Sequence, residues 1–106
     1  MTFKHLALAA CTALAAAGAH ADGVKVGMIT TLSGGGASLG IDVRDGFMLA
    51  IEQSGRDDIE VVIEDDQRKP DVAVQLSDKM IQSEKVDVMT GIIWSNLAMA
   101  VIPGAL

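Results

Sequence analysis

Three short apolar runs that alternate with segments of helical periodicity limit what this chain can fold into. The runs span residues 24–31, 59–63 and 86–91, and valine and isoleucine are frequent in them. Continuous β-branched runs of this length are typical of parallel strands that are buried on both faces. The alternation therefore predicts an α/β fold, an open parallel sheet with helices on both faces. Right-handed crossovers favour the strand order 2-1-3, with the first strand in the middle.

The segments between the runs carry the signals of helices. Residues 41–54 repeat apolar side chains at helical spacing, and Pro70 suits the first turn of a helix over 70–84. Residues 96–102 begin a third helix, which Pro103 ends or interrupts. The side chains expected to face the sheet are Val43, Phe47, Ala50 and Ile51 in the first helix and Ala73, Leu76, Met80 and Ile81 in the second.

Residues 1–21 have the three parts of a secretory signal peptide. Lys4 lies in a short basic region, residues 6–17 are apolar, and Ala19-His20-Ala21 is a cleavage motif. The apolar part is shorter than the roughly 20 residues that span a bilayer, so we expect no membrane insertion. The sequence predicts export to the periplasm and a mature chain that begins at Asp22.

A lipoprotein signal is the alternative interpretation of the same segment. Leu8-Ala9-Ala10-Cys11 fits the box after which bacterial lipoproteins are cut and lipidated. This alternative leaves only a short apolar stretch before the cysteine and makes no use of the motif that ends at Ala21. Cleavage after Ala21 is therefore favoured.

Removal of the signal peptide changes the chemistry available to the chain. The single cysteine, Cys11, and both histidines, His5 and His20, lie within it. The mature chain then lacks thiolate or imidazole ligands for zinc, Ser-His or Cys-His nucleophile pairs, and disulfides. Of the 8 basic residues Lys4 is removed, so that 7 face 14 acidic residues and the net charge is −7. We expect no enzyme, no metal, no cofactor and no nucleic-acid partner.

The predicted topology indicates where a ligand would bind. In open parallel sheets, ligands bind outside the carboxyl ends of the strands, where successive connections leave towards opposite faces. With the order 2-1-3, this point lies between the first and third strands. The loops 33–40 and 92–96 border it, and they hold most of the small, polar and aromatic residues that the core does not explain.

The first of these loops is rich in glycine, which lets a backbone approach a ligand, and it leads into a helix amino terminus, which favours anions. It is not a Walker loop, because Ile41-Asp42 stand where lysine and serine or threonine are required. It also fails the dinucleotide fingerprint, because Leu39 occupies the third glycine position. A flexible turn without a ligand remains the alternative.

The second loop contains Trp94, Ser95 and Asn96. Ser95 or Asn96 can cap the third helix, which would explain the loop by structure alone. Alternatively, the Ser95 hydroxyl and nearby N–H groups bind a carboxylate while Trp94 stacks on the apolar part of the ligand.

An acidic cluster, Glu64-Asp65-Asp66, ends the second strand away from this point. We expect a solvated strand end, with Arg68 and Lys69 offsetting its charge on the surface. A magnesium or acid–base site is the alternative.

Residues 24–103 resemble the start of the ABC-transporter solute-binding proteins of the branched-chain amino-acid type, which have the type I periplasmic-binding fold. The matching pieces are VKVGMITTLSG, the following ASLGID, the passage from Asp65 to Pro70, and VDVMTGIIWSN. The resemblance implies two lobes that close around a small ligand and deliver it to a membrane permease. Residues 22–106 would be a partial, truncated amino-terminal lobe, because the chain stops within an apolar segment at Leu106.

The resemblance also implies a set of ligand-binding residues. They are Ser33, Gly34 and Leu39 on one side and Trp94, Ser95 and Asn96 on the other. Ser95 falls where the family commonly places a hydroxyl on the ligand carboxylate. Leu39 stands where amino-acid binders often have an aromatic residue, and GIIWSN is similar to relatives that take up aromatic acids. The expected ligand is therefore a small carboxylate, an amino acid or an aromatic acid.

Two other functions are compatible with this fold. One is the exported ligand-sensing domain of a receptor, which would need a membrane span further along the chain. The other is a nucleotide-binding enzyme domain, which export and the two failed glycine motifs disfavour.

Overall fold

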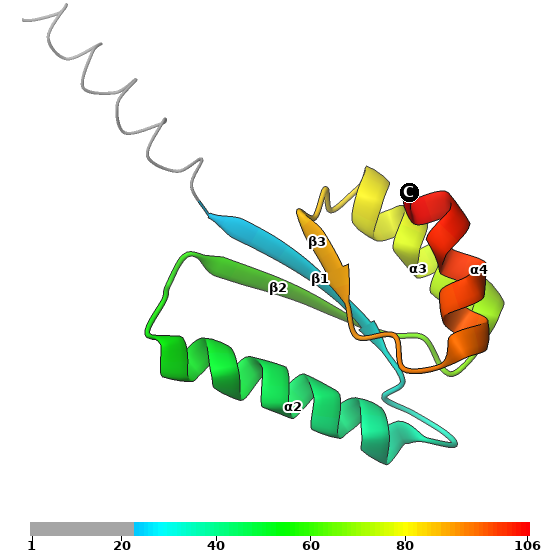
Figure 1. Ribbon diagram of the computed structural model, residues 1–106, viewed down its shortest axis with the longest axis horizontal. Helices are drawn as coiled ribbons and strands as arrows, with labels where there is room; N and C mark the ends of the chain where they lie inside the picture. Colours follow the sequence, from blue (N-terminus) through cyan, green and yellow to red (C-terminus); the bar gives the residue numbers. More distant parts are fainter. Residues whose placement is uncertain (1–22) are drawn as a thin grey trace, which may run out of the picture.

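The computed structural model describes residues 23–106, so the predicted signal peptide and Cys11 lie outside the described residues. Within this range an open sheet carries helices on both faces (Figure 1). In chain order the elements are β1 (Val24–Thr30), α2 (Ala37–Ser54), β2 (Ile59–Asp65), α3 (Pro70–Gln82), β3 (Val88–Thr90) and α4 (Ser95–Ala105). The α/β class predicted from the sequence is confirmed.

The sheet has the predicted strand order, β2-β1-β3, and both pairings are parallel. Val24 pairs with Ile59 on one side of β1, and Val26 pairs with Val88 on the other. Because β1 has neighbours on both sides, its residues from Val26 to Thr30 are all buried. Each large apolar side chain buried in this way stabilises the fold by about 1.5–3 kcal/mol.

The two faces of the sheet are covered differently. In Figure 1, α2 lies on one side of the sheet, and α3 and α4 lie together on the other. Ala73 of α3 and Leu97 and Val101 of α4 form a buried cluster between these two helices. Met80 of α3 is also fully buried, and its sulfur lies 2.8 Å from where a Cβ on Gly27 of β1 would be. This close contact brings α3 directly onto the middle strand.

Several element boundaries differ from the prediction. α2 begins at Ala37 rather than at residue 41, so Leu39 lies in the first helical turn and not in a loop. β3 is shorter than predicted and ends before Gly91, whose φ of 103° leaves the extended region. α4 continues through Pro103 to Ala105, so the expectation that proline ends this helix is wrong. Pro103 has no N–H to donate to the carbonyl four residues earlier, so α4 continues with one backbone hydrogen bond fewer.

The predicted inward faces of the helices are only partly correct. Ala73 and Met80 are buried in α3, but Ile81 is 39% exposed and Ser77 is buried in its place. In α2 the only buried residue is Gly40, whereas Phe47 and Ile51 are half-buried and Val43 and Ala50 are exposed. The first turn of α2 touches the end of β1, and the rest of the helix packs less tightly on the sheet.

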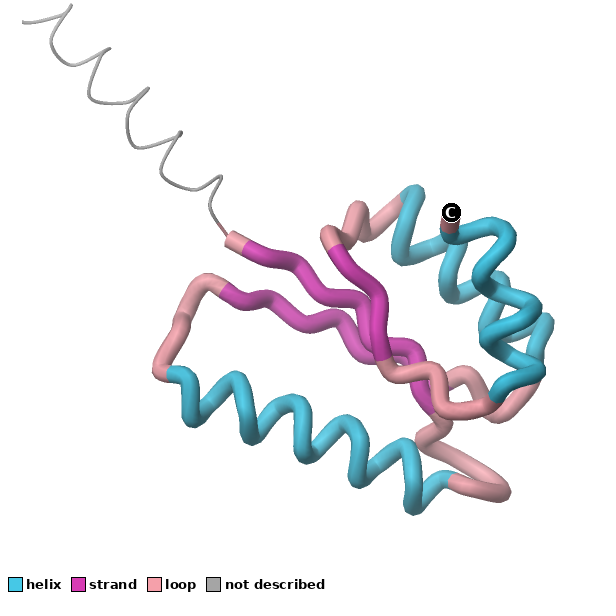
Figure 2. Tube along the Cα trace, in the orientation of Figure 1, coloured by secondary structure: helices cyan, strands magenta, loops and turns pink. Residues whose placement is uncertain are grey.

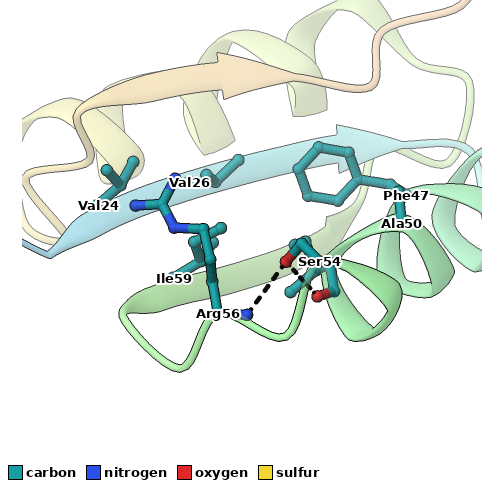
Figure 3. A pocket seen from close by; sticks show the side chains of 8 residues that line it. Val24, Val26, Phe47, Ala50, Ser54, Arg56 and Ile59 are labelled. Atoms are coloured by element: carbon teal, nitrogen blue, oxygen red, sulfur yellow. Dashed lines mark hydrogen bonds between the residues drawn. The ribbon is translucent and has the colours of Figure 1, made fainter.

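A mainly apolar pocket of about 300 Å³ lies between α2 and the sheet (Figure 3). Val24 and Ile59, the first residues of β1 and β2, line it together with Phe47 of α2. The backbone N–H of Arg56 donates to the Ser54 hydroxyl at its rim. This pocket is therefore at the amino ends of the strands, the edge opposite to the one where a ligand is expected.

Candidate functional site

The loops that follow β1, β2 and β3 come together at the carboxyl edge of the sheet (Figure 2). The Trp94 indole N–H donates to the Thr31 hydroxyl oxygen at 2.7 Å. The Thr31 hydroxyl in turn donates to the Asp66 carboxylate at 2.6 Å. Thr31 and Asp66 are 0% exposed, so these bonds form away from water. A relay of two hydrogen bonds thus links all three loops.

The glycine-rich loop lies against the Trp94 ring. Gly36 has a φ of 86°, and a Cβ on it would lie 2.5 Å from the Trp94 Cζ2 atom. Any side chain at this position would therefore be strained and would collide with the indole. The two loops that were expected to border a ligand are in direct contact at this point.

The acidic cluster at the end of β2 is part of this site, and the expectation of a solvated strand end is wrong. Asp66 is fully buried, and its second oxygen makes no hydrogen bond within residues 23–106. Asp65 accepts hydrogen bonds from the Leu32 N–H at 2.8 Å and from the Ser33 hydroxyl. Because β2 is directly beside β1, the end of β2 meets the loop that leaves β1.

The ionisation of Asp65 is tied to this arrangement. Burial raises the pKa of Asp65, but hydrogen bonds outweigh it and hold the pKa below its ordinary value of 3.8. The donors are the Ser33 hydroxyl and the backbone N–H groups of Leu32, Gln67 and Ser33. Asp65 therefore acts as a charged anchor for the start of the glycine-rich loop.

The expectation that Arg68 offsets the charge of the acidic cluster on the surface is wrong, because Arg68 is in none of the ion pairs of residues 23–106. Its guanidinium carbon lies 3.7 Å from the centroid of the Trp94 ring, a cation–π contact. Gln67 and Arg68 both have left-handed backbones, with φ of 55° and 58°. Such conformations cost about 1–3 kcal/mol each in residues other than glycine. The Arg68 N–H donates to Asp66 at 2.8 Å and the Gln67 N–H donates to Asp65 at 2.9 Å, which stabilises the turn.

The predicted site residues differ in how exposed they are and in what they contact. Gly34 is exposed in the loop, Ser33 is held by Asp65, and Leu39 is 53% exposed at the start of α2. Trp94 is half-buried, with Arg68 over its ring, so this contact competes with the predicted stacking of a ligand.

Ser95 and Asn96 are exposed and form the first turn of α4. The residue that caps this helix is Trp94, and no side chain makes a capping hydrogen bond. The interpretation of Ser95 or Asn96 as a helix cap is therefore wrong. α2 likewise begins without a side-chain cap, at Gly36. Two helix amino termini without a side-chain cap thus adjoin the loops of the site, and such termini favour anions.

Residues 23–106 show no helix with the features of a membrane span and no grouping typical of a metal site. In this part of the chain, no helix combines the length and hydropathy that crossing a membrane requires. The same residues contain no group of three acidic, histidine or cysteine side chains placed to hold a metal ion.

Comparison with protein families identifies the family of this chain. The family model described as periplasmic binding protein matches residues 23–105. The chain belongs to the periplasmic binding protein family. No curated protein sequence matches it.

Solved structures with the same fold include several ABC-transporter proteins. A solute-binding protein from R. palustris in complex with benzoate is 37% identical, with a TM-score of 0.73, and the match covers 78% of this chain and 24% of that one. A solute-binding protein from Rhodopseudomonas palustris BisB5 in complex with 3,4-dihydroxybenzoic acid is 34% identical, with a TM-score of 0.76 and coverages of 79% and 24%. A leucine-binding protein from Thermotoga maritima is 27% identical, with a TM-score of 0.73 and coverages of 77% and 24%. The chain thus spans about a quarter of the length of these periplasmic binding proteins.

Three residues of the site in this family member were not expected from the sequence: Thr31, Asp66 and Arg68. A signal for the first two was present, because the order 2-1-3 places the ends of β1 and β2 one strand spacing apart, about 4.8 Å. Polar residues that end neighbouring strands at the same edge can bond to each other. The stacking of Arg68 on Trp94 has no such signal, because it depends on the left-handed turn formed by Gln67 and Arg68.

Proposed function

We propose that this chain begins the solute-binding component of an ABC importer, which captures a small carboxylate in the periplasm and delivers it to a membrane permease. Membership of the periplasmic binding protein family and the likeness to solute-binding proteins of ABC transporters support this role. In this proposal residues 1–21 direct export, and residues 22–106 belong to the amino-terminal lobe of a two-lobe protein. The ligand is an amino acid or an aromatic acid.

One observation supports the position of the ligand more than any other. The glycine-rich loop and the start of α4 meet at Trp94, and both helices that begin there lack side-chain caps. A carboxylate placed between them would accept hydrogen bonds from backbone N–H groups and from the exposed Ser95 hydroxyl. The residues proposed to line the ligand are Ser33, Gly34, Leu39, Trp94, Ser95 and Asn96.

The energies of these interactions indicate that a single lobe binds weakly. A helix amino terminus contributes about 0.3–1 kcal/mol to a nearby anion, and up to about 2 kcal/mol when partly buried. One or two charge-assisted hydrogen bonds add about 1.5–3 kcal/mol each. Micromolar affinity requires about 8 kcal/mol after the cost of association. The experiments therefore use the mature full-length protein.

Calorimetry on a Ser95→Ala variant tests the proposal. Loss of the hydroxyl should weaken binding of the carboxylate ligand by about 1–3 kcal/mol. Ser83→Ala is the matched control, because Ser83 is exposed after α3 at the opposite edge of the sheet and should leave the affinity unchanged. Equal affinities of wild type and Ser95→Ala would remove Ser95 from the site. Failure of the wild-type protein to bind any amino acid or aromatic acid would refute the function itself.

A further inference from the structure

We propose that Arg68 is a ligand-binding residue that donates hydrogen bonds from its guanidinium to the carboxylate of the solute, an inference that rests on the proposed function. The position of the Arg68 side chain supports this inference. The guanidinium stacks on Trp94 at 3.7 Å, and one of its terminal nitrogens lies 3.7 Å from where a Cβ on Gly35 would be. Arg68 is therefore next to both loops that border the proposed ligand position.

The guanidinium N–H groups of Arg68 have no hydrogen-bond acceptor within residues 23–106. Ion pairs within residues 23–106 join Lys25 to Glu84, Arg44 to Asp45, Arg56 to Asp58 and Lys79 to Glu64, and Arg68 is in none of them. Its side chain also donates no hydrogen bond to any residue of this range that the structure records, and the residue is exposed. A guanidinium that stacks on a ring keeps its N–H groups at the rim of its plane, where they suit a carboxylate.

The carboxylates nearest in sequence are engaged elsewhere. Asp65 accepts the Leu32 and Gln67 N–H groups on one oxygen and the Ser33 hydroxyl on the other. Asp66 is fully buried and accepts the Thr31 hydroxyl and the Arg68 backbone N–H. The same two aspartates thus hold the backbone of the turn and leave the guanidinium as the exposed cation beside the glycine-rich loop.

The backbone of this turn supports a role beyond packing. Two consecutive residues, Gln67 and Arg68, are left-handed without being glycine, and strained conformations of this kind cluster at functional sites. The hydrogen bonds that the Gln67 and Arg68 N–H groups donate to the two aspartates keep the turn in this state and so fix the direction in which the Arg68 side chain leaves the backbone. Pre-organisation of this kind lowers the entropy that is lost when a flexible arginine binds an anion.

Binding measurements on the mature full-length protein with Arg68→Gln and Arg68→Lys test the inference. The probes are benzoate, 3,4-dihydroxybenzoate and leucine, and the acid that binds most tightly is then compared with its primary amide, which keeps the shape and loses the charge. Arg68→Gln should weaken binding of the acid about 10- to 100-fold and should reduce the preference for acid over amide by a similar factor. Arg68→Lys should fall between wild type and Arg68→Gln, because lysine keeps the charge but not the planar fork.

Lys69→Gln provides the matched control, since it removes the same charge from the next residue, which is exposed. It should leave the preference for acid over amide unchanged. Equal loss of acid and amide affinity in Arg68→Gln would make Arg68 a packing residue and overturn the inference. Unchanged acid affinity in a folded Arg68→Gln protein would overturn it as well, while leaving the proposed function in place. If the wild-type protein bound no carboxylate, the proposed function would fail and this inference with it.

Discussion

Replacing Gly40 by alanine should destabilise the protein although alanine is the better helix former. Gly40 is the buried residue of α2, and a Cβ on it would lie 1.7 Å from the Thr31 carbonyl oxygen and 3.0 Å from the Thr31 nitrogen. Both atoms belong to the backbone, so no side chain can rotate away, and α2 or the end of β1 must move by more than an ångström. Overpacking typically costs about 1–3 kcal/mol and occasionally more. Alanine returns only about 0.5–1 kcal/mol of helix propensity.

Because the clash is severe, its cost should be at the upper end of this range, about 3 kcal/mol, so the net loss in the free energy of unfolding should be about 2 kcal/mol. Gly46→Ala is the matched control in the same helix, because Gly46 is exposed and a Cβ on it would meet nothing within 4 Å. That variant should be more stable than wild type by about 0.5–1 kcal/mol. Denaturant unfolding of the mature full-length protein, followed by circular dichroism, measures both. If the two variants changed stability in the same direction, the close approach of α2 to Thr31 would not exist.

Two further predictions concern the polar residues at the carboxyl edge. Thr31→Val should lower the free energy of unfolding by about 2–4 kcal/mol, because both Trp94 and buried Asp66 lose a hydrogen-bond partner. Thr30→Val is the control. It should be neutral or stabilising, because the Thr30 hydroxyl is buried without a partner within residues 23–106. Equal costs in denaturant titrations would contradict the relay. Because the pKa of Asp65 is lowered on folding, its carboxylate stabilises the folded state at pH values above 3.8, the ordinary pKa of the group. This contribution is lost as the pH falls through the pKa of Asp65 in the folded state. The stability difference between wild type and Asp65→Asn should therefore shrink in acid titrations from about pH 5 to pH 2, and a difference that grew would refute the assignment.

The fold was readable from the sequence because its signals are local and agree with one another. The valine-rich run of β1 matches a strand buried between two neighbours, and Pro70 begins α3 as its fixed φ allows. The exposure of Val43 was not readable, since helical spacing shows which residues share a face but not how closely that face approaches the sheet.

The meeting of the two loops at the carboxyl edge was predictable, but the contacts between them were not. Ligands of open parallel sheets bind at the carboxyl edge, and this rule predicted that the loops 33–40 and 92–96 lie next to each other. The two loops are in contact, because Gly36 lies against the Trp94 ring. The role of Asp66 was missed because a run of acidic residues suggests a solvated surface, whereas this carboxylate is buried beneath Thr31. Only the three-dimensional arrangement shows that one aspartate of the pair anchors the glycine-rich loop while the other positions Trp94 through Thr31.

A crystal structure of the mature full-length protein with its most tightly bound carboxylate would test the central claim most directly. We expect the acid group at the carboxyl edge of the sheet, within hydrogen-bond distance of the Ser95 hydroxyl or of the N–H groups that begin α4, and beside the glycine-rich loop. Hydrogen bonds of about 2.7–3.2 Å would meet this expectation. A ligand found instead in the pocket lined by Phe47 and Ile59, at the opposite edge, would contradict it.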